Sequence, residues 1–251
     1  MVRPRVRIRY RKDQDLRFLG HHDLLRAWER LLRRADVRPA QTEGFHKRAR
    51  LNFPSALAVG ICGLDEVIEL ELENEPDLSA LAASLDARAP AGLSIVSIER
   101  MPAGARFSQP RAAEYDIRIP DDRLADVAER LERWRTNAAA VDKTDEPSPP
   151  TQEPTSAAAP SFAAPEAGAS LEDAAPAEAP TNVAATVAQA PPDRLPASVE
   201  SLRLEDGALR MRLKLGEAGA VRPRELLAWL DLSDLETTGT LLQRTRVEVS
   251  G

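Results

Sequence analysis

The amino-acid sequence predicts an α+β protein built from two ferredoxin-like units, each with the element order β-α-β-β-α-β. The first observation is that strand-type alternation and helix-type spacing of apolar residues follow one another in this order twice along the chain. The second is a long acidic stretch, rich in proline and alanine, that interrupts the second copy. The expected division is residues 1–102 for the first unit, 103–136 with 198–251 for the second, and 137–197 for a disordered insertion.

The first strand and the first helix are the clearest elements of the first unit. Residues 6–10 alternate between apolar and basic side chains, which is typical of a half-buried strand with an arginine face. From His21 to Arg34, apolar residues recur at three- and four-residue spacing and predict a helix with one buried face. The helix arginines off this stripe form either a solvated surface paired with Glu29 or an anion-binding face; they are Arg26, Arg30, Arg33 and Arg34.

Alternation and capping predict the rest of the first unit. Residues 38–53 are expected to form a loop, a short strand, a second loop and a strand. Residues 67–73 alternate between apolar and acidic side chains, which predicts a strand with one buried face and one acidic face in solvent. Asp77 is the expected N-cap of a helix over 78–85, and residues 93–98 form the next strand.

The second unit repeats this order around the insertion. A strand over 114–119 and a helix over 124–134 precede it. After it, Asp206-Gly207 is a strong hairpin turn between strands expected over 198–204 and 208–215. Pro223 suits the first turn of a last helix, and a strand over 241–249 completes the unit.

The predicted insertion differs in composition from the rest of the chain. Residues 137–197 hold 11 of the 20 prolines, and Phe162 is their one aromatic residue. Such a stretch cannot bury enough apolar area to offset the entropy lost on ordering. It carries 2 Lys and Arg against 9 Asp and Glu. We therefore expect an acidic disordered segment that competes weakly for any basic surface of the same molecule.

Positive charge is concentrated at the beginning of the chain. The whole protein has a net charge of −6, yet residues 1–50 carry 15 Lys and Arg against 6 Asp and Glu. A local basic surface attracts polyanions even on an acidic protein, because screening over roughly 10 Å makes nearby charges decide. The residues expected to contact phosphates, with one aromatic residue to stack on a base, are Arg7, Arg9, Arg26, Arg30, Lys47, Arg48, Arg50 and Phe45.

Other classes of site and compartment are disfavoured by the sequence. A single cysteine, Cys62, excludes an internal disulfide and a CxxC zinc site, and it fits a reducing cytoplasm. The N-terminus has no apolar signal region, and no run of about 18 apolar residues predicts a membrane span. We expect no metal, no cofactor and no P-loop, Rossmann or serine-hydrolase motif. His21 and His46 are structural or surface histidines, or alternatively an acid or base for RNA cleavage.

Three runs near the N-terminus resemble the radical SAM-linked protein family: residues 9–12 (RYRK), 16–26 (LRFLGHHDLLR) and 29–35 (ERLLRRA). Members of this family typically read RYxKxGxLRFLSHLDLxRxxERxLRRA and continue with GFNPHPRxSFxxPLxxG, which corresponds here to residues 44–60. Gly20 stands where the family has serine, and Lys47-Arg48-Ala49 stand in place of Pro-His-Pro. The resemblance covers nearly all of the two structured parts and is most specific in the first fifty residues.

The resemblance implies a partner, because this domain of unknown function is encoded beside, or fused to, B12-binding radical SAM proteins. The chain has no CxxxCxxC motif and cannot hold the iron–sulfur cluster itself. The expected function is therefore a non-catalytic accessory protein of a radical SAM enzyme that binds RNA or another polyanion. The alternatives are a histidine-dependent endoribonuclease, and a protein–protein interaction module that uses a strand edge or the acidic insertion.

Overall fold

The structure, a computed structural model, describes residues 3–43, 47–141, 195–217 and 219–250. Most of the expected insertion lies outside these residues, as do Phe45 and His46. The first half of the described chain contains β1 (Arg5–Lys12), the 3-10 helix η1 (Gln14–Phe18), α1 (His21–Arg34), β2 (Leu51–Asn52), β3 (Cys62–Glu71), α2 (Leu78–Asp86) and β4 (Leu93–Arg100). The second half contains β5 (Pro110–Arg118), η2 (Asp121–Arg123), α3 (Leu124–Val141), β6 (Val199–Glu205), β7 (Ala208–Lys214), α4 (Pro223–Trp229) and β8 (Gln243–Val249).

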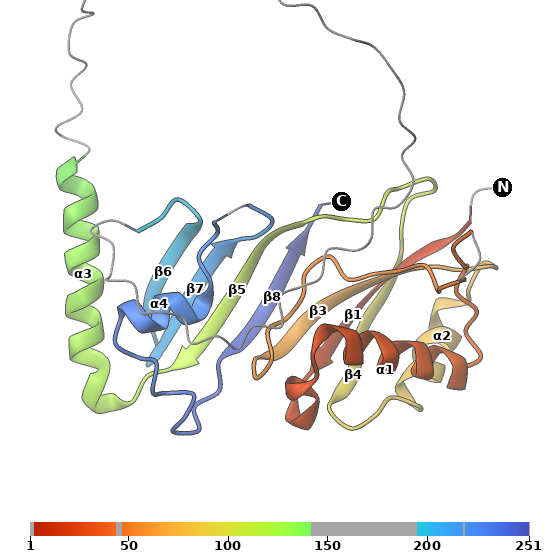
Figure 1. Cartoon of the computed structure of the whole chain (residues 1–251), viewed down its shortest axis with the longest axis horizontal. Helices are drawn as coiled ribbons and strands as arrows, with labels where there is room; N and C mark the ends of the chain where they lie inside the picture. Colours follow the sequence, from red (N-terminus) through yellow and green to blue (C-terminus); the bar gives the residue numbers. More distant parts are fainter. Residues whose placement is uncertain (1–2, 44–46, 142–194, 218, 251) are drawn as a thin grey trace, which may run out of the picture.

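The fold is a mixed α+β arrangement around one mostly antiparallel sheet (Figure 1). Seven strands follow the order β4-β1-β3-β8-β5-β7-β6, and the short β2 pairs with β3 outside this path. Among the described strands only β3 and β8 pair in parallel, through Cys62 with Gln243 and Gly63 with Arg244. The two halves of the sheet are therefore joined by a short ladder where β3 begins.

The helices cover one face of the sheet, and the apolar residues beneath them form two clusters. In the first half, Val6, Ile8 and Tyr10 of β1 pack against α1, and the Tyr10 ring meets the Trp28 ring edge-on at 5.0 Å. In the second half, strand residues pack with α3 and α4, and Leu57 from the segment before β3 joins this second cluster. The first half thus contributes apolar side chains to the core of the second.

Local sequence explains the helix boundaries. The predicted bounds of α1 are confirmed, and its N-cap position is Gly20, which has no side chain to cap the helix. The predicted cap of α2 is also confirmed, because Asp77 accepts hydrogen bonds from the backbone N of Ser79 at 2.9 Å and of Ala80 at 3.1 Å. The α3 helix continues to Val141, which is within the stretch expected to be the insertion.

Candidate nucleic-acid interface

The arginines of the first fifty residues lie on opposite sides of the sheet. On β1, Val6 and Ile8 are buried beneath α1, so the alternate residues Arg5, Arg7 and Arg9 point to the other face. The arginines of α1 belong to the helical layer that covers the first face. The strand and helix residues that were predicted to share one binding face therefore do not form a single surface.

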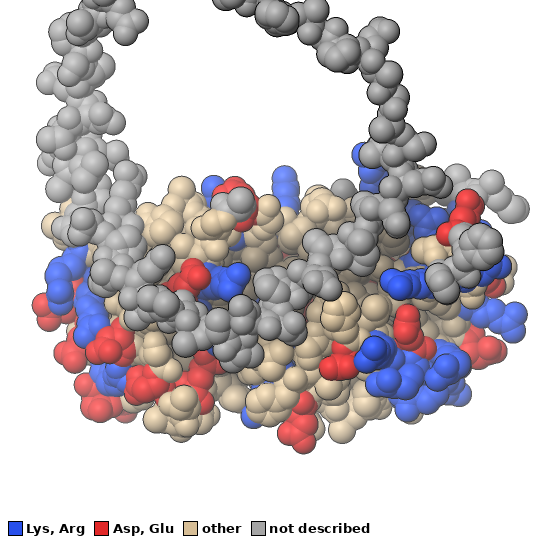
Figure 2. All heavy atoms as spheres, in the orientation of Figure 1, with Lys and Arg blue, Asp and Glu red and all other residues tan. Residues whose placement is uncertain are grey.

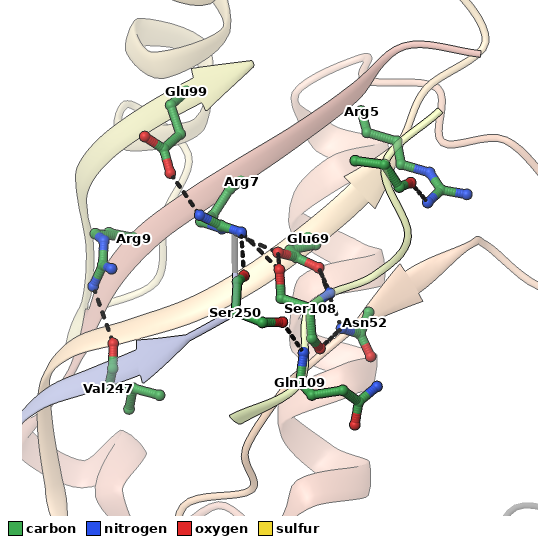
Figure 3. Close-up of polar contacts among 11 residues, drawn as sticks. Arg5, Arg7, Arg9, Asn52, Glu69, Glu99, Ser108, Gln109, Val247 and Ser250 are labelled. Atoms are coloured by element: carbon green, nitrogen blue, oxygen red, sulfur yellow. Dashed lines mark hydrogen bonds and ion pairs between the residues drawn. The ribbon is translucent and has the colours of Figure 1, made fainter. Parts of the chain in front are cut away.

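The strand arginines are engaged by carboxylates of the neighbouring strand β3, and Figure 3 shows this for Arg7 and Glu69. Arg5 donates from Nε to Glu71 at 2.9 Å, and Arg7 donates from Nε to Glu69 at 3.0 Å. Arg9 donates to Asp65 at 2.7 Å. The prediction of a solvated acidic face on this strand is wrong, because Glu69 and Glu71 are only 0% and 4% exposed. Each buried charge is compensated by an arginine directly opposite.

The pairs of β1 arginines and β3 carboxylates form a row, which we call the arginine–carboxylate ladder. Segments from distant parts of the chain close over it. Ser108 donates from its backbone N and from Oγ to the two oxygens of Glu69, at 2.8 and 2.7 Å. Arg7 donates to Ser108 Oγ at 2.7 Å and to the carbonyl of Ser250 at 3.3 Å, as Figure 3 shows. The side chains of Arg7 and Arg9 are left 14% and 23% exposed. Their guanidinium groups hold the protein together and are not presented to solvent as a row.

The helix arginines have the opposite environment. Arg26, Arg30, Arg33 and Arg34 are all exposed, and Figure 2 shows blue side chains gathered over the region of α1. Arg26 is 3.5 Å from Asp23, with both side chains largely in solvent. The pairs expected between Arg26 or Arg33 and Glu29 are not found among the described residues. Arg30, Arg33 and Arg34 make no ion pair within the described parts of the chain.

The segment after α1 adds further cations. Lys47 and Arg48 are exposed. Thr42 N donates to the carbonyl of Arg48 at 2.8 Å, and Arg48 N donates to Thr42 Oγ1 at 3.0 Å, which fixes the backbone at Arg48. Arg50 is half-buried and lies 3.3 Å from Glu71, so it belongs partly to the ladder. Gly44, Phe45 and His46 lie outside the described residues, so the predicted stacking role of Phe45 stays a prediction.

His21 occupies a packing position at the start of α1. It is half-buried, and its ring meets Phe53 edge-on at 5.4 Å and His22 at 5.9 Å. Burial, the neighbouring His22 and the charge of Lys12 lower its pKa, which favours the neutral ring. No carboxylate accepts a hydrogen bond from this ring within the described residues. The other histidine considered for acid–base chemistry, His46, lies outside those residues.

A buried polar cluster at the junction of the halves was not found by sequence reasoning. Arg244 of β8 donates to Glu66 of β3 at 2.7 Å, and both side chains are buried. Lys12 is also buried and donates from Nζ to the carbonyl of Leu19 at 2.8 Å. The sequence signal was weak, since Arg244 sits in an alternating strand beside the exposed Arg246.

The sheet face of the second half is also charged, but its arginines are neutralised. A shallow depression of about 510 Å³ on β5, β6, β7 and β8 is lined by Asp116, Arg210 and Arg212, among others. Arg212 alone contacts Glu114, Glu200 and Glu248. Burial raises the pKa of Asp116. This depression therefore presents balanced charges and not an excess of cations.

Metal-ligand groups and membrane-spanning helices are both absent from the described residues. No group of three or more histidine, cysteine or acidic side chains is placed there to hold a metal ion. No helix in those ranges has both the length and the apolar character needed to cross a bilayer.

Comparison with known proteins gives one family. The sequence matches the family described as an uncharacterised protein conserved in bacteria (DUF2344) over residues 5–149. That range runs from the start of β1 to beyond the end of α3, and it includes the exposed cations of α1 and of the segment after it. No curated protein matches the sequence.

Proposed function

The chain belongs to this bacterial family, and we propose that it is a non-catalytic accessory protein that binds RNA or another polyanion. The binding surface would be the basic helix face, which we define as Arg26, Arg30, Arg33 and Arg34 of α1 with Lys47 and Arg48 of the following segment. The observation that carries the proposal is that, Arg26 apart, these exposed cations have no carboxylate partner among the described residues.

The arginines of β1 and the arginines of α1 differ in ion pairing, and this difference affects how readily each can bind a phosphate. A guanidinium already bonded to a buried carboxylate gains little from a phosphate, because it would first have to leave a charge uncompensated in the interior. An exposed and unpaired guanidinium releases counterions from the nucleic acid when it binds a phosphate. We therefore assign Arg7 and Arg9 to the support of the fold, and the helix cations to the ligand.

The partner in this proposal is a radical SAM enzyme. This assignment rests on the resemblance of the N-terminal motifs to the radical SAM-linked family. The chain has one cysteine, so a partner would have to supply the iron–sulfur cluster. The acid–base alternative gains no support from the packing of His21 against Phe53. A protein that binds RNA and presents it to a modifying enzyme accounts for a basic surface without an assembled catalytic group.

We also propose that each half is a ferredoxin-like unit, with boundaries near residues 1–102 and at 103–136 with 198–251. The support is the strand order, which reads β4-β1-β3-β2 in the first half and β8-β5-β7-β6 in the second. Numbered within its own half, each order is the fourth, first, third and second strand. The two apolar clusters divide the same way, except that Leu57 and Ile61 cross to the second.

The test is the affinity for a fluorescein-labelled single-stranded RNA, measured by anisotropy over a salt series. The variant combines Arg26→Ala, Arg30→Ala and Arg33→Ala. Its control removes the same charge from exposed arginines of the second half, through Arg133→Ala, Arg135→Ala and Arg203→Ala. A further variant, Lys47→Ala with Arg48→Ala, tests the segment after α1 and leaves Arg50 on the ladder.

We expect the helix variant to lose at least about tenfold in affinity near 0.1 M salt, while the control changes about twofold or less. The slope of log Kd against log salt should fall by roughly 0.7 for each phosphate contact that is removed from a single strand. Equal losses of RNA affinity in the two triple variants would show that the affinity depends on net charge alone. That result would contradict the assignment of RNA binding to the basic helix face.

A further inference from the structure

Phe18 is an aromatic residue that belongs to neither apolar cluster of the described residues. It ends η1 and is 56% exposed, more than the other large apolar side chains that are exposed in the described residues. A phenyl ring left in water does not contribute the stabilising free energy that its burial would add to folding. Single exposed apolar residues are common on proteins, so exposure alone does not identify a site.

The ring is already stacked against a cation. The Arg17 guanidinium carbon lies 4.3 Å from the centroid of the Phe18 ring. Arg17 is held in this place because its Nη1 donates to the carbonyl of Gln14 at 3.0 Å. Both a flat aromatic ring and a guanidinium plane are surfaces on which unpaired nucleobases stack. The pair therefore offers a preformed stacking surface and not a single exposed side chain.

This surface lies near the N-terminal end of α1, the helix that carries four residues of the basic helix face. Only Leu19 and Gly20 separate Phe18 from the first residue of α1. From there, His22, Arg26, Arg30 and Arg33 follow on the exposed side of the helix at spacings of four, four and three residues. Each four-residue step advances about 6 Å along the axis. If the phosphates of a nucleic-acid strand follow this row, the strand ends near the start of α1, which Phe18 precedes by three residues.

We propose that Phe18 and Arg17 form a base-stacking subsite, and that the polyanion is a single-stranded nucleic acid. The inference rests on the proposed function and narrows its ligand class. Polyphosphates and sulfated sugars have no flat base to stack, and the bases of a duplex are already stacked inside it. An aromatic surface just before a helix that carries a row of exposed arginines favours a ligand with both phosphates and unpaired bases.

A second exposed apolar residue belongs to the neighbouring segment. Gly60 donates from its backbone N to the carbonyl of Arg17 at 2.9 Å, so the backbone at Val59, which is 47% exposed, runs beside the segment that carries Phe18. A protein partner docked on this patch would use apolar area from both side chains. A nucleobase would need the ring of Phe18 specifically, and this difference makes the two occupants separable by experiment.

The experiment compares a fluorescein-labelled single-stranded RNA with inorganic polyphosphate as a competitor that carries charge without bases. Phe18→Leu keeps apolar area but removes the ring, and Phe18→Trp keeps a ring. Val96→Ala is the control, because Val96 is a comparably exposed apolar residue on β4. Binding by the full-length protein and its variants is followed by anisotropy and by displacement with polyphosphate.

We expect Phe18→Leu to weaken RNA binding by at least about fivefold, the lower end of the value of one stacked base, with polyphosphate affinity unchanged. Phe18→Trp and Val96→Ala should retain RNA affinity within about twofold. Unchanged RNA binding in Phe18→Leu, or equal loss for RNA and polyphosphate, would overturn the subsite. If the unmodified protein binds neither probe, the proposed function fails and the subsite fails with it.

Discussion

Arg244 of β8 donates from Nε to Oε1 of Glu66 on β3 at 2.7 Å, and this buried ion pair bridges the two halves of the sheet. The two side chains are 1% and 3% exposed. Arg244 also donates to Ser55 Oγ at 3.0 Å, in the segment before β3. Gly63 is required beside the pair, because a Cβ there would clash with Glu66. One guanidinium thus links β8, β3 and the preceding loop.

Removing one member of this pair is expected to destabilise the protein strongly. Arg244→Ala leaves the Glu66 carboxylate buried without its partner, which costs about 3–5 kcal/mol. Replacing both members by apolar residues of similar volume, in Arg244→Met with Glu66→Leu, should recover much of this loss. Urea denaturation measures both. Arg133→Ala, which breaks an exposed pair with Glu129, is the control and should change the unfolding free energy by less than about 1 kcal/mol.

The pH dependence of stability is expected to report the buried Lys12. Burial lowers the pKa of its ammonium group to about 8, against an opposing effect of the Glu66 charge. Between about pH 8 and the ordinary lysine pKa, the unfolded chain binds more protons than the folded one. Stability linked to Lys12 therefore rises with pH across this window, and the penalty is fully present below it. The rise amounts to roughly 3 kcal/mol at most.

The measurement is the difference in unfolding free energy between the unmodified protein and Lys12→Met, taken at pH 7 and near pH 10. Other groups titrate in the same range, since burial also raises the pKa of Cys62 and of Tyr10. Because Cys62 and Tyr10 are present in both proteins, their contributions cancel in the difference between the two unfolding free energies. A difference that stays constant with pH would contradict the lowered pKa of Lys12.

Local patterns predicted most elements because the physics that forms them is local. The apolar spacing from His21 to Arg34 and the carboxylate of Asp77 give α1 and the start of α2 without reference to the rest of the chain. Alternation in β1 also gave the correct arginine face. Alternation cannot say what lies above that face, and Ser108 and Ser250 come from segments far away in the sequence.

The junction cluster was beyond sequence reasoning for a related reason. The register between β5 and β8 shifts between Glu114 and Tyr115, so Arg246 lies opposite Glu114 and Arg244 opposite Tyr115. Such a bulge changes which side chains face the core, because strand side chains alternate with period two. Arg244 is buried and Arg246 exposed for this reason, although the two look equivalent in the sequence. Which histidines or aromatics act on a ligand stays a prediction.

The acidic segment is expected to compete for the basic helix face. Residues 142–194 lie outside the described residues, and the expectation rests on the excess of acidic over basic residues in the insertion predicted from the sequence. Replacing residues 142–194 by a flexible Gly/Ser linker should raise the affinity for single-stranded RNA several-fold at low salt, with little effect near 0.5 M salt, where charge interactions are screened. Anisotropy at both salt concentrations measures it. Unchanged RNA affinity at low salt would contradict the expected competition of the acidic segment for the basic helix face.

Single substitutions in the two groups of arginines are expected to have opposite effects. Arg7→Ala leaves Glu69 buried with one donor fewer, so the unfolding free energy should fall by about 3 kcal/mol. RNA affinity at a temperature where the variant is folded should stay within about twofold. Arg30→Ala removes an exposed cation without an ion-pair partner among the described residues, so it should reduce RNA affinity and leave stability within about 0.5 kcal/mol. Urea denaturation and anisotropy on both variants test the separation; a loss of RNA affinity in Arg7→Ala equal to that in Arg30→Ala would place the strand arginines in the binding surface after all.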